Sequence, residues 1–197
     1  MPAPTTVHGF ALGLLVNHPT SRLPSPLRIA GKWETDNIVI PDLVGRMKAS
    51  KWDVGVSSIR GLLGELSAGW ESLDPERITR FQSNPDLAAA FVGHWRNHRR
   101  QYGYTLLAEL TYQAGELLED HPDIDLDIDV LLVDEYQDLN HADIRLIREV
   151  SRRNVSILAI GDDDQSIYGW RMAAPEGIRE FVDQFVDAAD YPLTISR

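Results

Sequence analysis

The sequence predicts an α/β fold in which a mainly helical segment is inserted beside a small parallel sheet. Two short apolar runs, 129–135 and 155–162, have the composition of buried strands, and an amphipathic stretch at 140–153 separates them. A strand, a helix and a strand in such a short span form a βαβ unit, which implies parallel strands. From about 33 to 120 the pattern is helical but interrupted.

The remaining elements follow from periodicity and from residues that begin or end helices. "TTVHGFALGLL" (5–15) predicts a helix, and the proline-rich stretch 17–28 predicts a loop that leaves this unit. Asn84 and Asn140 are expected N-caps, as is Ser57 or Ser58, whereas Pro41 is expected near a helix start. Helices are predicted at 40–50, 56–70, 84–103, 104–120, 140–153 and 175–185 (with Pro175 in its first turn), and a third strand at 191–196.

Composition excludes several classes of protein. The chain has 43% hydrophobic and 25% charged residues and no cysteine, so it has no disulfide and no thiolate metal site. It contains neither an apolar run of the roughly 18 residues that a membrane span needs nor a secretory signal, so a cytoplasmic protein without a membrane partner is expected. Of its 30 acidic residues, 17 lie from 122 to 197, against 7 basic ones. Any contact with DNA must therefore be local, because bulk attraction is absent.

Acidic side chains follow both predicted strands. Asp134 and Glu135 end the first strand, and Asp162, Asp163 and Asp164 end the second. Parallel strands bring their carboxyl ends to one edge of the sheet, so these acids are expected to lie close together. One carboxylate of such a pair can hold Mg²⁺ while its neighbour orients or deprotonates a water. The alternatives are that the pair caps the following helix or is simply solvated.

These residues carry a family resemblance. "LLVDEYQDLN" (131–140) and "AIGDDDQSIYGWR" (159–171) resemble motifs II and III of the UvrD/Rep family of superfamily 1 DNA helicases, and "TTVHGFALGLL" resembles the motif that precedes them in that family. The resemblance implies a partial RecA-like motor domain, a parallel sheet with flanking helices, formed by 1–16 and 122–197. It also implies a helical insertion subdomain at 17–121. The implied activity is ATP hydrolysis coupled to 3′–5′ movement along single-stranded DNA, with a role in DNA repair.

The resemblance also implies roles for residues of the ATP site. Asp134 would hold Mg²⁺, and Glu135 would be the catalytic base. Gln137 and Asp138 would belong to the nucleotide site and link it to the neighbouring motifs. Gln165 would sense the γ-phosphate and take part in catalysis.

A second set of residues would lie on the DNA side. Thr6 and His8 would touch the DNA backbone, and Tyr168, Trp170 and Arg171 would face the strand, with Trp170 stacking on a base. Trp170 could instead be a core residue, although "YGWR" is not an apolar periodic setting. His8, at the start of an apolar helix, could likewise be structural.

Two departures from the family pattern matter. Met172 stands where the family usually has the glycine of "WRGA". More seriously, the chain has no glycine-rich loop ending in Gly-Lys-Ser/Thr, since its Gly31-Lys32 pair is followed by Trp33 and lacks the upstream glycine. ATP and Mg²⁺ are therefore expected only in a complete parent protein, and the isolated chain is expected to be inactive and to leave a flank of its sheet exposed.

The expected partners are single-stranded DNA and the remainder of the helicase motor; the oligomeric state is not indicated. Two other functions stay open: a non-catalytic DNA- or protein-binding module derived from a helicase, and a metal-dependent phosphohydrolase that uses the acidic cluster alone. The basic stretch 94–103 is either a DNA patch or a solvated helix face. The acidic alternation at 123–129 lacks the glycine and the final glutamate of a calcium loop and is interpreted as a solvated edge.

Overall fold

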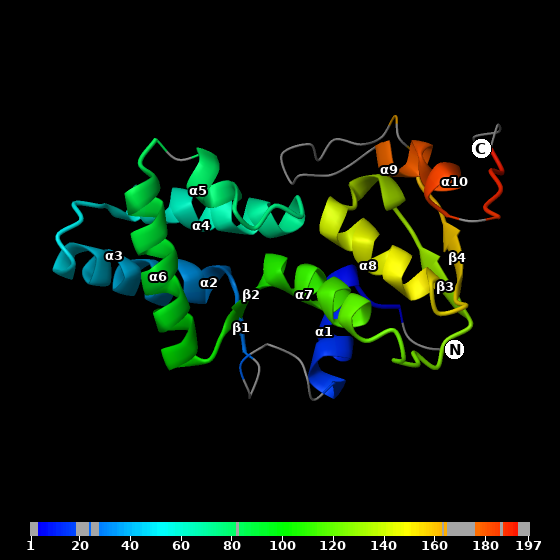
Figure 1. Cartoon of the computed structure of the whole chain (residues 1–197), viewed down its shortest axis with the longest axis horizontal. Helices are drawn as coiled ribbons and strands as arrows, with labels where there is room; N and C mark the ends of the chain where they lie inside the picture. The colour runs from blue at the N-terminus through cyan, green and yellow to red at the C-terminus, as the bar shows by residue number, and fades with distance from the viewer. Residues whose placement is uncertain are drawn as a thin grey trace.

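A computed structural model describes residues 4–18, 24, 28–81, 83–162, 164, 176–185 and 187–192. Its elements form two bodies side by side (Figure 1): a helical body from α2 to α6, and an α/β body that contains α1, α7, α8 and the strands β3 and β4. The mixed α/β fold with parallel strands and a helical insertion is therefore confirmed. Within the described part of the chain, no helix combines the length and apolar character needed to cross a membrane.

The first helix, α1 (Val7–Asn17), starts at the threonine pair of the sequence. The Thr6 hydroxyl is its N-cap and accepts a hydrogen bond from Gly9 N at 3.0 Å. This bond satisfies one of the backbone donors that a helix leaves unpaired in its first turn. The helix predicted at 5–15 is confirmed, with its boundaries shifted by two residues.

Two very short strands pair with each other where the chain enters and leaves the helical body. β1 (Ile29–Ala30) and β2 (Thr105–Leu106) pair in parallel, with Ile29 opposite Thr105 and Ala30 opposite Leu106. The Thr105 N–H also donates to the carbonyl oxygen of Arg28 at 2.8 Å. The chain thus enters and leaves the insertion side by side. We refer to this pairing as the β1–β2 clasp; sequence patterns did not predict it.

The helix predicted at 40–50 is present, and further helical turns precede it. α2 (Lys32–Glu34), the π-helical turn η1 (Thr35–Val39) and α3 (Ile40–Ala49) follow one another without a break. A proline inside a helix lacks an N–H donor and crowds the carbonyl one turn before it, and the wider π turn provides room there. Pro41 lies in the first turn of α3, as predicted.

Three more helices complete the insertion: α4 (Val56–Glu71), α5 (Arg77–Phe81) and α6 (Pro85–Tyr102). The N-cap of α4 is Gly55, so the prediction of Ser57 or Ser58 is wrong: the extended backbone of Gly55 leads directly into the helix, and both serines already lie in its first turn. Asn84 is confirmed as the N-cap of α6, because its side chain accepts from Leu87 N at 3.1 Å.

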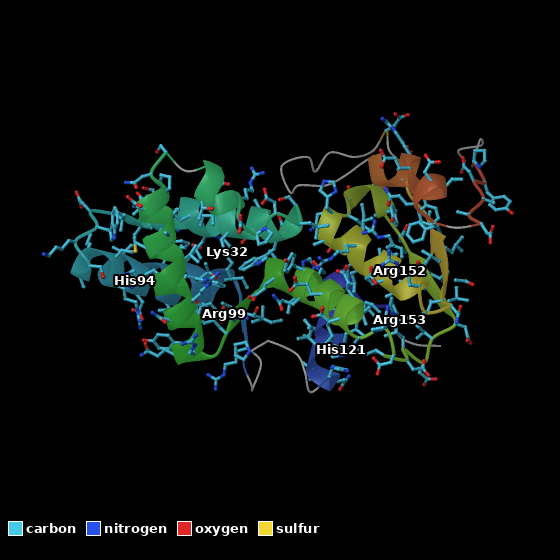
Figure 2. The ribbon with its side chains drawn as sticks, in the orientation of Figure 1. Lys32, His94, Arg99, His121, Arg152 and Arg153 are labelled. Atoms are coloured by element: carbon cyan, nitrogen blue, oxygen red, sulfur yellow. The ribbon has the colours of Figure 1, made fainter. Side chains whose placement is uncertain are left out.

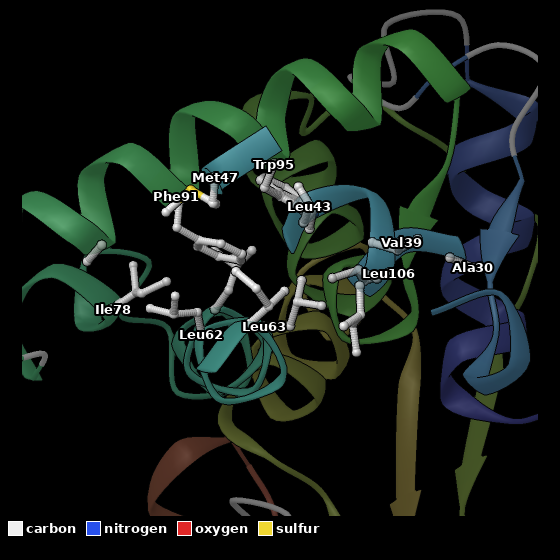
Figure 3. Packing of buried hydrophobic residues seen from close by; sticks show 14 of the residues in the cluster. Ala30, Val39, Leu43, Met47, Leu62, Leu63, Ile78, Phe91, Trp95 and Leu106 are labelled. Atoms are coloured by element: carbon white, nitrogen blue, oxygen red, sulfur yellow. The ribbon is translucent and has the colours of Figure 1, made fainter. Parts of the chain in front are cut away.

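The helical body has a core of its own. Figure 3 shows apolar side chains of α3, α4 and α6 meeting in its interior, among them Leu43, Met47, Leu62, Phe91 and Trp95. Leu43 and Met47, like Phe91 and Trp95, are four residues apart and therefore share one face of their helix. The buried residues of this core all lie between positions 30 and 106, and Ala108 and Tyr112 of the next helix pack against them.

Helix α7 (Leu107–Asp120) joins the two bodies. Its residues Leu110, Ala114 and Leu118 are fully buried in a second core, which contains residues of α1 and of α8 (His141–Ser151). The division at residue 121 stays a prediction, but the buried face of α7 belongs to this second core. The C-terminal end of α7 is held by Arg153 (Figure 2), whose Nη2 donates to the carbonyl oxygens of Leu118 and His121.

The predicted βαβ unit is present. β3 (Val130–Val133) and β4 (Ser156–Ala159) pair in parallel, with Val130 opposite Ser156, and α8 connects them. Asn140 is confirmed as the N-cap of α8, where its side chain and that of Asp143 form a capping box.

The β3–β4 sheet buries one face and exposes the other. Leu131, Val133, Ile157 and Ala159 contact the cores beneath the sheet. The alternate side chains point outward, and the exposed large apolar residues are Val130, Leu132, Leu158 and Ile160. This alternation follows from the two-residue period of a strand. Each sheet has two strands in the part of the chain that the structure describes.

The C-terminal helix predicted at 175–185 is two short helices, α9 (Glu176–Arg179) and α10 (Phe181–Gln184). Glu180 interrupts them, because its carbonyl oxygen starts a new turn by accepting from Asp183 N and Gln184 N. Pro175 lies outside the described residues. Of the strand predicted at 191–196, residues 191–192 are not in a strand and the rest lie outside the described residues.

Candidate functional site

The acidic pair Asp134 and Glu135 lies where β3 ends. Both side chains are exposed, directly after the buried Val133. Glu135 has a left-handed backbone conformation, with φ of 52°, and its N–H donates to Asp134 Oδ1 at 3.0 Å. A positive φ is unfavourable for a residue with a side chain, and such strain is concentrated at functional sites. The sharp turn presents two neighbouring carboxylates beyond the carboxyl end of the strand.

Gln137 connects this turn to the neighbouring strand. Only 2% of its surface is exposed. Its Nε2 donates to Glu135 Oε2 at 2.7 Å, and its Oε1 accepts from Asp162 N at 3.0 Å. One buried amide therefore fixes the Glu135 carboxylate relative to the residues that follow β4. The predicted roles of Gln137, at a nucleotide and as a link between neighbouring motifs, stay predictions.

Backbone bonds hold the same two chain segments together. Ile160 N donates to Val133 O at 2.8 Å, and Tyr136 N donates to Ile160 O at 2.9 Å, so the pairing of the strands continues past their ends. Gly161 lies in this narrow space: a Cβ there would be 2.6 Å from Gln137 Oε1. Gly161 is not among the residues predicted from the sequence, although its position between an apolar strand and a run of acids is a usable signal.

Asp138 lies in the 3₁₀ turn η2 (Tyr136–Asp138). Its N–H donates to Glu135 O at 2.9 Å, and its half-buried side chain has an Oδ1 without a hydrogen-bond partner among the described residues. The neighbouring Tyr136 is fully buried, and its ring meets that of Phe181 edge-on, 5.3 Å between centroids. Burial raises the pKa of Tyr136 to about 12, against the opposing effect of the nearby Arg148 charge.

The two N-terminal DNA candidates lie at the start of α1. The Thr6 hydroxyl is already used as the helix N-cap, so its structural role is visible and its predicted contact with DNA is not tested. The His8 side chain is half-buried in the first turn and forms no hydrogen bond with any other described residue. The adjacent Val7 packs against the cores below β3 and β4, which brings the beginning of α1 to the same body as the acidic turn.

The remaining predicted site residues belong to the segment that follows β4. Gln165, Tyr168, Trp170 and Arg171 lie outside the described residues, as does Asp163. Among the residues that the structure does describe, no three histidine or acidic side chains are grouped as ligands for a metal ion. The Mg²⁺ role of Asp134 therefore stays a prediction, and the one exposed carboxylate it offers matches the one or two that Mg²⁺ usually takes from a protein.

The basic stretch 94–103 does not form a continuous charged face. Arg99, on the side of α6 toward α7 (Figure 2), bonds the buried Glu109 at 2.7 Å, while His98 is buried against Tyr104 with 3.0 Å between Nδ1 and the hydroxyl. Burial raises the pKa of Glu109, which the Arg99 charge opposes, and burial lowers the pKa of His98. His98 and Arg99 thus serve the interior, whereas Arg96 and Arg100 are exposed.

The fold and the acidic turn define an α/β protein whose polar groups gather at the carboxyl ends of parallel strands. The chain belongs to the UvrD/REP helicase N-terminal domain family, whose model matches residues 3–186. It is 38% identical over 87 residues to DNA helicase II of Haemophilus influenzae, covering 42% of this chain and 12% of that protein. It is 45% identical over 58 residues to DNA helicase II of Escherichia coli, covering 29% and 8%. It is 51% identical over 51 residues to the ATP-dependent DNA helicase Rep of Buchnera aphidicola, covering 26% and 8%. The matches thus span about a tenth of the length of these relatives.

Proposed function

We propose that this chain is part of an ATP-dependent DNA helicase that moves 3′–5′ along single-stranded DNA, and that it carries the Mg²⁺ and catalytic-water half of the ATP site. One observation carries the proposal. The Glu135 carboxylate is exposed at the end of β3 and is oriented by the buried Gln137, which also bonds the residues after β4. A base held in this way can act on a water beside a phosphate. Because Gln137 also bonds the segment after β4, a movement of that segment would change the position of the Glu135 carboxylate.

The two carboxylates take different roles in this proposal. Asp134 holds Mg²⁺, which neutralises developing charge on the phosphates when it is bound. Glu135 accepts the proton of the attacking water, because its Oε2 is fixed by Gln137 and its side chain is exposed beyond the end of β3. Gln165 then senses the γ-phosphate, and Asp138 joins this site to the neighbouring motifs.

The DNA half of the proposal concerns the ends of α1 and of the segment after β4. Thr6 and His8 contact the DNA backbone, and Tyr168, Trp170 and Arg171 contact the strand, with Trp170 as the stacking platform. Stacking suits this chain because its acidic C-terminal third provides no broad positive surface. Family membership supports a DNA substrate, and the residue roles rest on the motif resemblance.

The experiment that tests the proposal compares two glutamates in the complete protein that contains this chain. Glu135→Gln is expected to keep ATP binding and to lower DNA-stimulated hydrolysis on the order of 10²–10⁴-fold, the usual contribution of a general base. Glu76→Gln, the same chemical change at an exposed loop residue, is expected to hydrolyse ATP normally. Equal activities of the two variants would refute the role of Glu135.

A non-catalytic DNA- or protein-binding module is the second candidate, because the 197 residues contain no phosphate-binding loop. Both candidates predict that the isolated chain lacks DNA-stimulated ATPase activity, since a triphosphate has no backbone cradle and no lysine there. They differ in the complete protein, where the module predicts DNA binding without turnover. A turnover number near 1 per second for the isolated chain would contradict both.

A further inference from the structure

A cavity of about 120 Å³ lies where α8 meets α9, α10 and the turn that follows α4. Three of its lining residues are basic and come from one face of α8: His141, Arg145 and Arg148, at positions i, i+4 and i+7. None of its lining residues belongs to the predicted ATP or DNA site. The cavity is therefore a separate feature of the molecule, formed between the insertion and the α/β body.

Arg148 is the cation in this cavity that has no acidic partner. Its guanidinium makes no ion pair with a described residue, and its buried Nε has no hydrogen-bond acceptor there. Arg145, in contrast, is engaged: its Nη2 donates to the Tyr112 carbonyl oxygen at 2.7 Å, its guanidinium lies 4.7 Å from the Tyr112 ring centroid, and Glu119 is 4.0 Å away. A partly buried cation without a partner is costly unless an anion accompanies it.

A second unsatisfied donor lies beside Arg148. The Tyr136 side chain is fully buried, and its hydroxyl has no hydrogen-bond partner among the described residues. Gly177, which lines the cavity, lies against the Tyr136 ring, since a Cβ on this glycine would be 3.6 Å from Cε1. The charge of Arg148 also acts on the Tyr136 hydroxyl. The buried Tyr136 hydroxyl thus lies near the cavity without lining it, and Arg148 is the unpaired donor that does line it.

One acid lines the cavity among the described residues. Glu180 faces it from the end of α9, and its Oε2 accepts from Gln184 Nε2 at 3.2 Å. Against it stand Arg148, Arg145 and the imidazole of His141, so donors and positive charge predominate. The volume equals that of several water molecules, which is room for a tetrahedral oxyanion of five heavy atoms.

We infer that this cavity binds a phosphate-type oxyanion, with the Arg148 guanidinium as its main ligand. Arginine suits this role because its planar fork donates two parallel hydrogen bonds to such an anion. The phosphate group comes either from free phosphate or from the backbone of a nucleic acid, which present the same oxygens. The inference goes beyond the proposed helicase function and does not depend on it, because the cavity would bind an anion whether or not the chain takes part in ATP hydrolysis.

The test is a titration of the 197-residue chain with inorganic phosphate in phosphate-free buffer, followed by calorimetry and by the arginine Nε–H resonances in NMR spectra. Wild-type protein is expected to bind saturably, Arg148→Gln to bind at least about tenfold more weakly, and Glu180→Gln to bind about 3- to 10-fold more tightly because a like charge is removed. Arg96→Gln, the same loss of charge on the exposed side of α6, is expected to bind as wild type.

Phosphate affinity should fall in Arg148→Gln and rise in Glu180→Gln. A folding defect would instead lower the affinity of both variants. The absence of saturable phosphate binding to the wild type, or equal affinities of wild type and Arg148→Gln, would overturn the inference. A competing arm adds oligo-dT: displacement of phosphate by the oligonucleotide assigns the site to a nucleic-acid backbone, and undisturbed phosphate binding assigns it to a free anion. The titration does not involve ATP hydrolysis. Its outcome is therefore independent of whether the proposed helicase function is correct.

Discussion

Gly161→Ala is expected to disconnect Gln137 from both of its partners. The added Cβ would be 2.6 Å from Gln137 Oε1 and 3.3 Å from the backbone nitrogens of Tyr136 and Gln137. The backbone cannot withdraw easily, because Tyr136 N is bonded to Ile160 O. The amide end of Gln137 moves instead, and the cost is the loss of its hydrogen bonds rather than steric overlap.

The size of the stability loss follows from the two hydrogen bonds that Gln137 loses. The bond from Asp162 N is a neutral one, of about 0.5–1.5 kcal/mol net, and the bond to the Glu135 carboxylate adds about 1–2 kcal/mol once its exposure is considered. Replacing glycine by alanine returns about 0.4–1 kcal/mol by restricting the unfolded chain. The free energy of unfolding should therefore fall by about 2 kcal/mol.

Urea unfolding followed by circular dichroism measures this loss, and a double-mutant cycle tests its cause. Once Gln137→Ala has been introduced, Gly161→Ala has neither bond left to break and should stabilise the protein by about 0.4–1 kcal/mol. The coupling free energy is then about 2.5 kcal/mol. Gly93→Ala is the matched control, since its Cβ would meet nothing within 4 Å on α6 and should stabilise the helix slightly. Additive losses in the cycle, or a Gly161→Ala protein as stable as wild type, would show that this reasoning is wrong.

Three further predictions concern single side chains. Arg153→Ala should lower the free energy of unfolding by about 2–4 kcal/mol, because the buried guanidinium caps the end of α7; a loss no larger than that of the exposed Arg152→Ala would contradict this. Burial raises the pKa of Tyr136 to about 12, so the unfolded chain releases this proton first and stability falls as the pH rises from about 10 toward about 12. In phosphate-free buffer Tyr136→Phe should lose less stability over that range, and identical pH profiles would disprove the assignment. In the complete protein, Trp170→Ala should weaken single-stranded DNA binding by roughly 5- to 150-fold with little dependence on base, measured by fluorescence anisotropy; unchanged affinity with a lowered melting temperature would make Trp170 a core residue.

The βαβ unit could be predicted because its signals are local. Strand and helix patterns, and caps such as Asn84 and Asn140, depend on neighbours within a few residues. The β1–β2 clasp could not be predicted, since two-residue strands have no pattern of their own and their pairing depends on the fold between them. The start of α4 was misplaced for a related reason: a serine inside a first turn resembles a cap in sequence, and tertiary packing decides between it and Gly55.

Some features of the candidate site could be predicted from the sequence and others could not. Adjacent acids after a buried strand were enough to predict Asp134 and Glu135 at the end of β3, because strand direction alone puts them there. The strained turn at Glu135 and the close approach of Gly161 to Gln137 are consequences of three-dimensional packing, which no spacing encodes. The cavity around Arg148 could not be predicted either, because three basic residues on one helix face are typical of a solvated surface.

The β1–β2 clasp has a consequence for how the chain folds. It pairs position 29 with position 105, so its few hydrogen bonds must compensate the loss of entropy on closing a very long loop. That cost falls when the intervening helices have already collapsed onto Phe91 and Trp95 and shortened the distance between the ends. The helical body should then acquire its structure first, and the clasp should form late, as the step that docks this body onto α7.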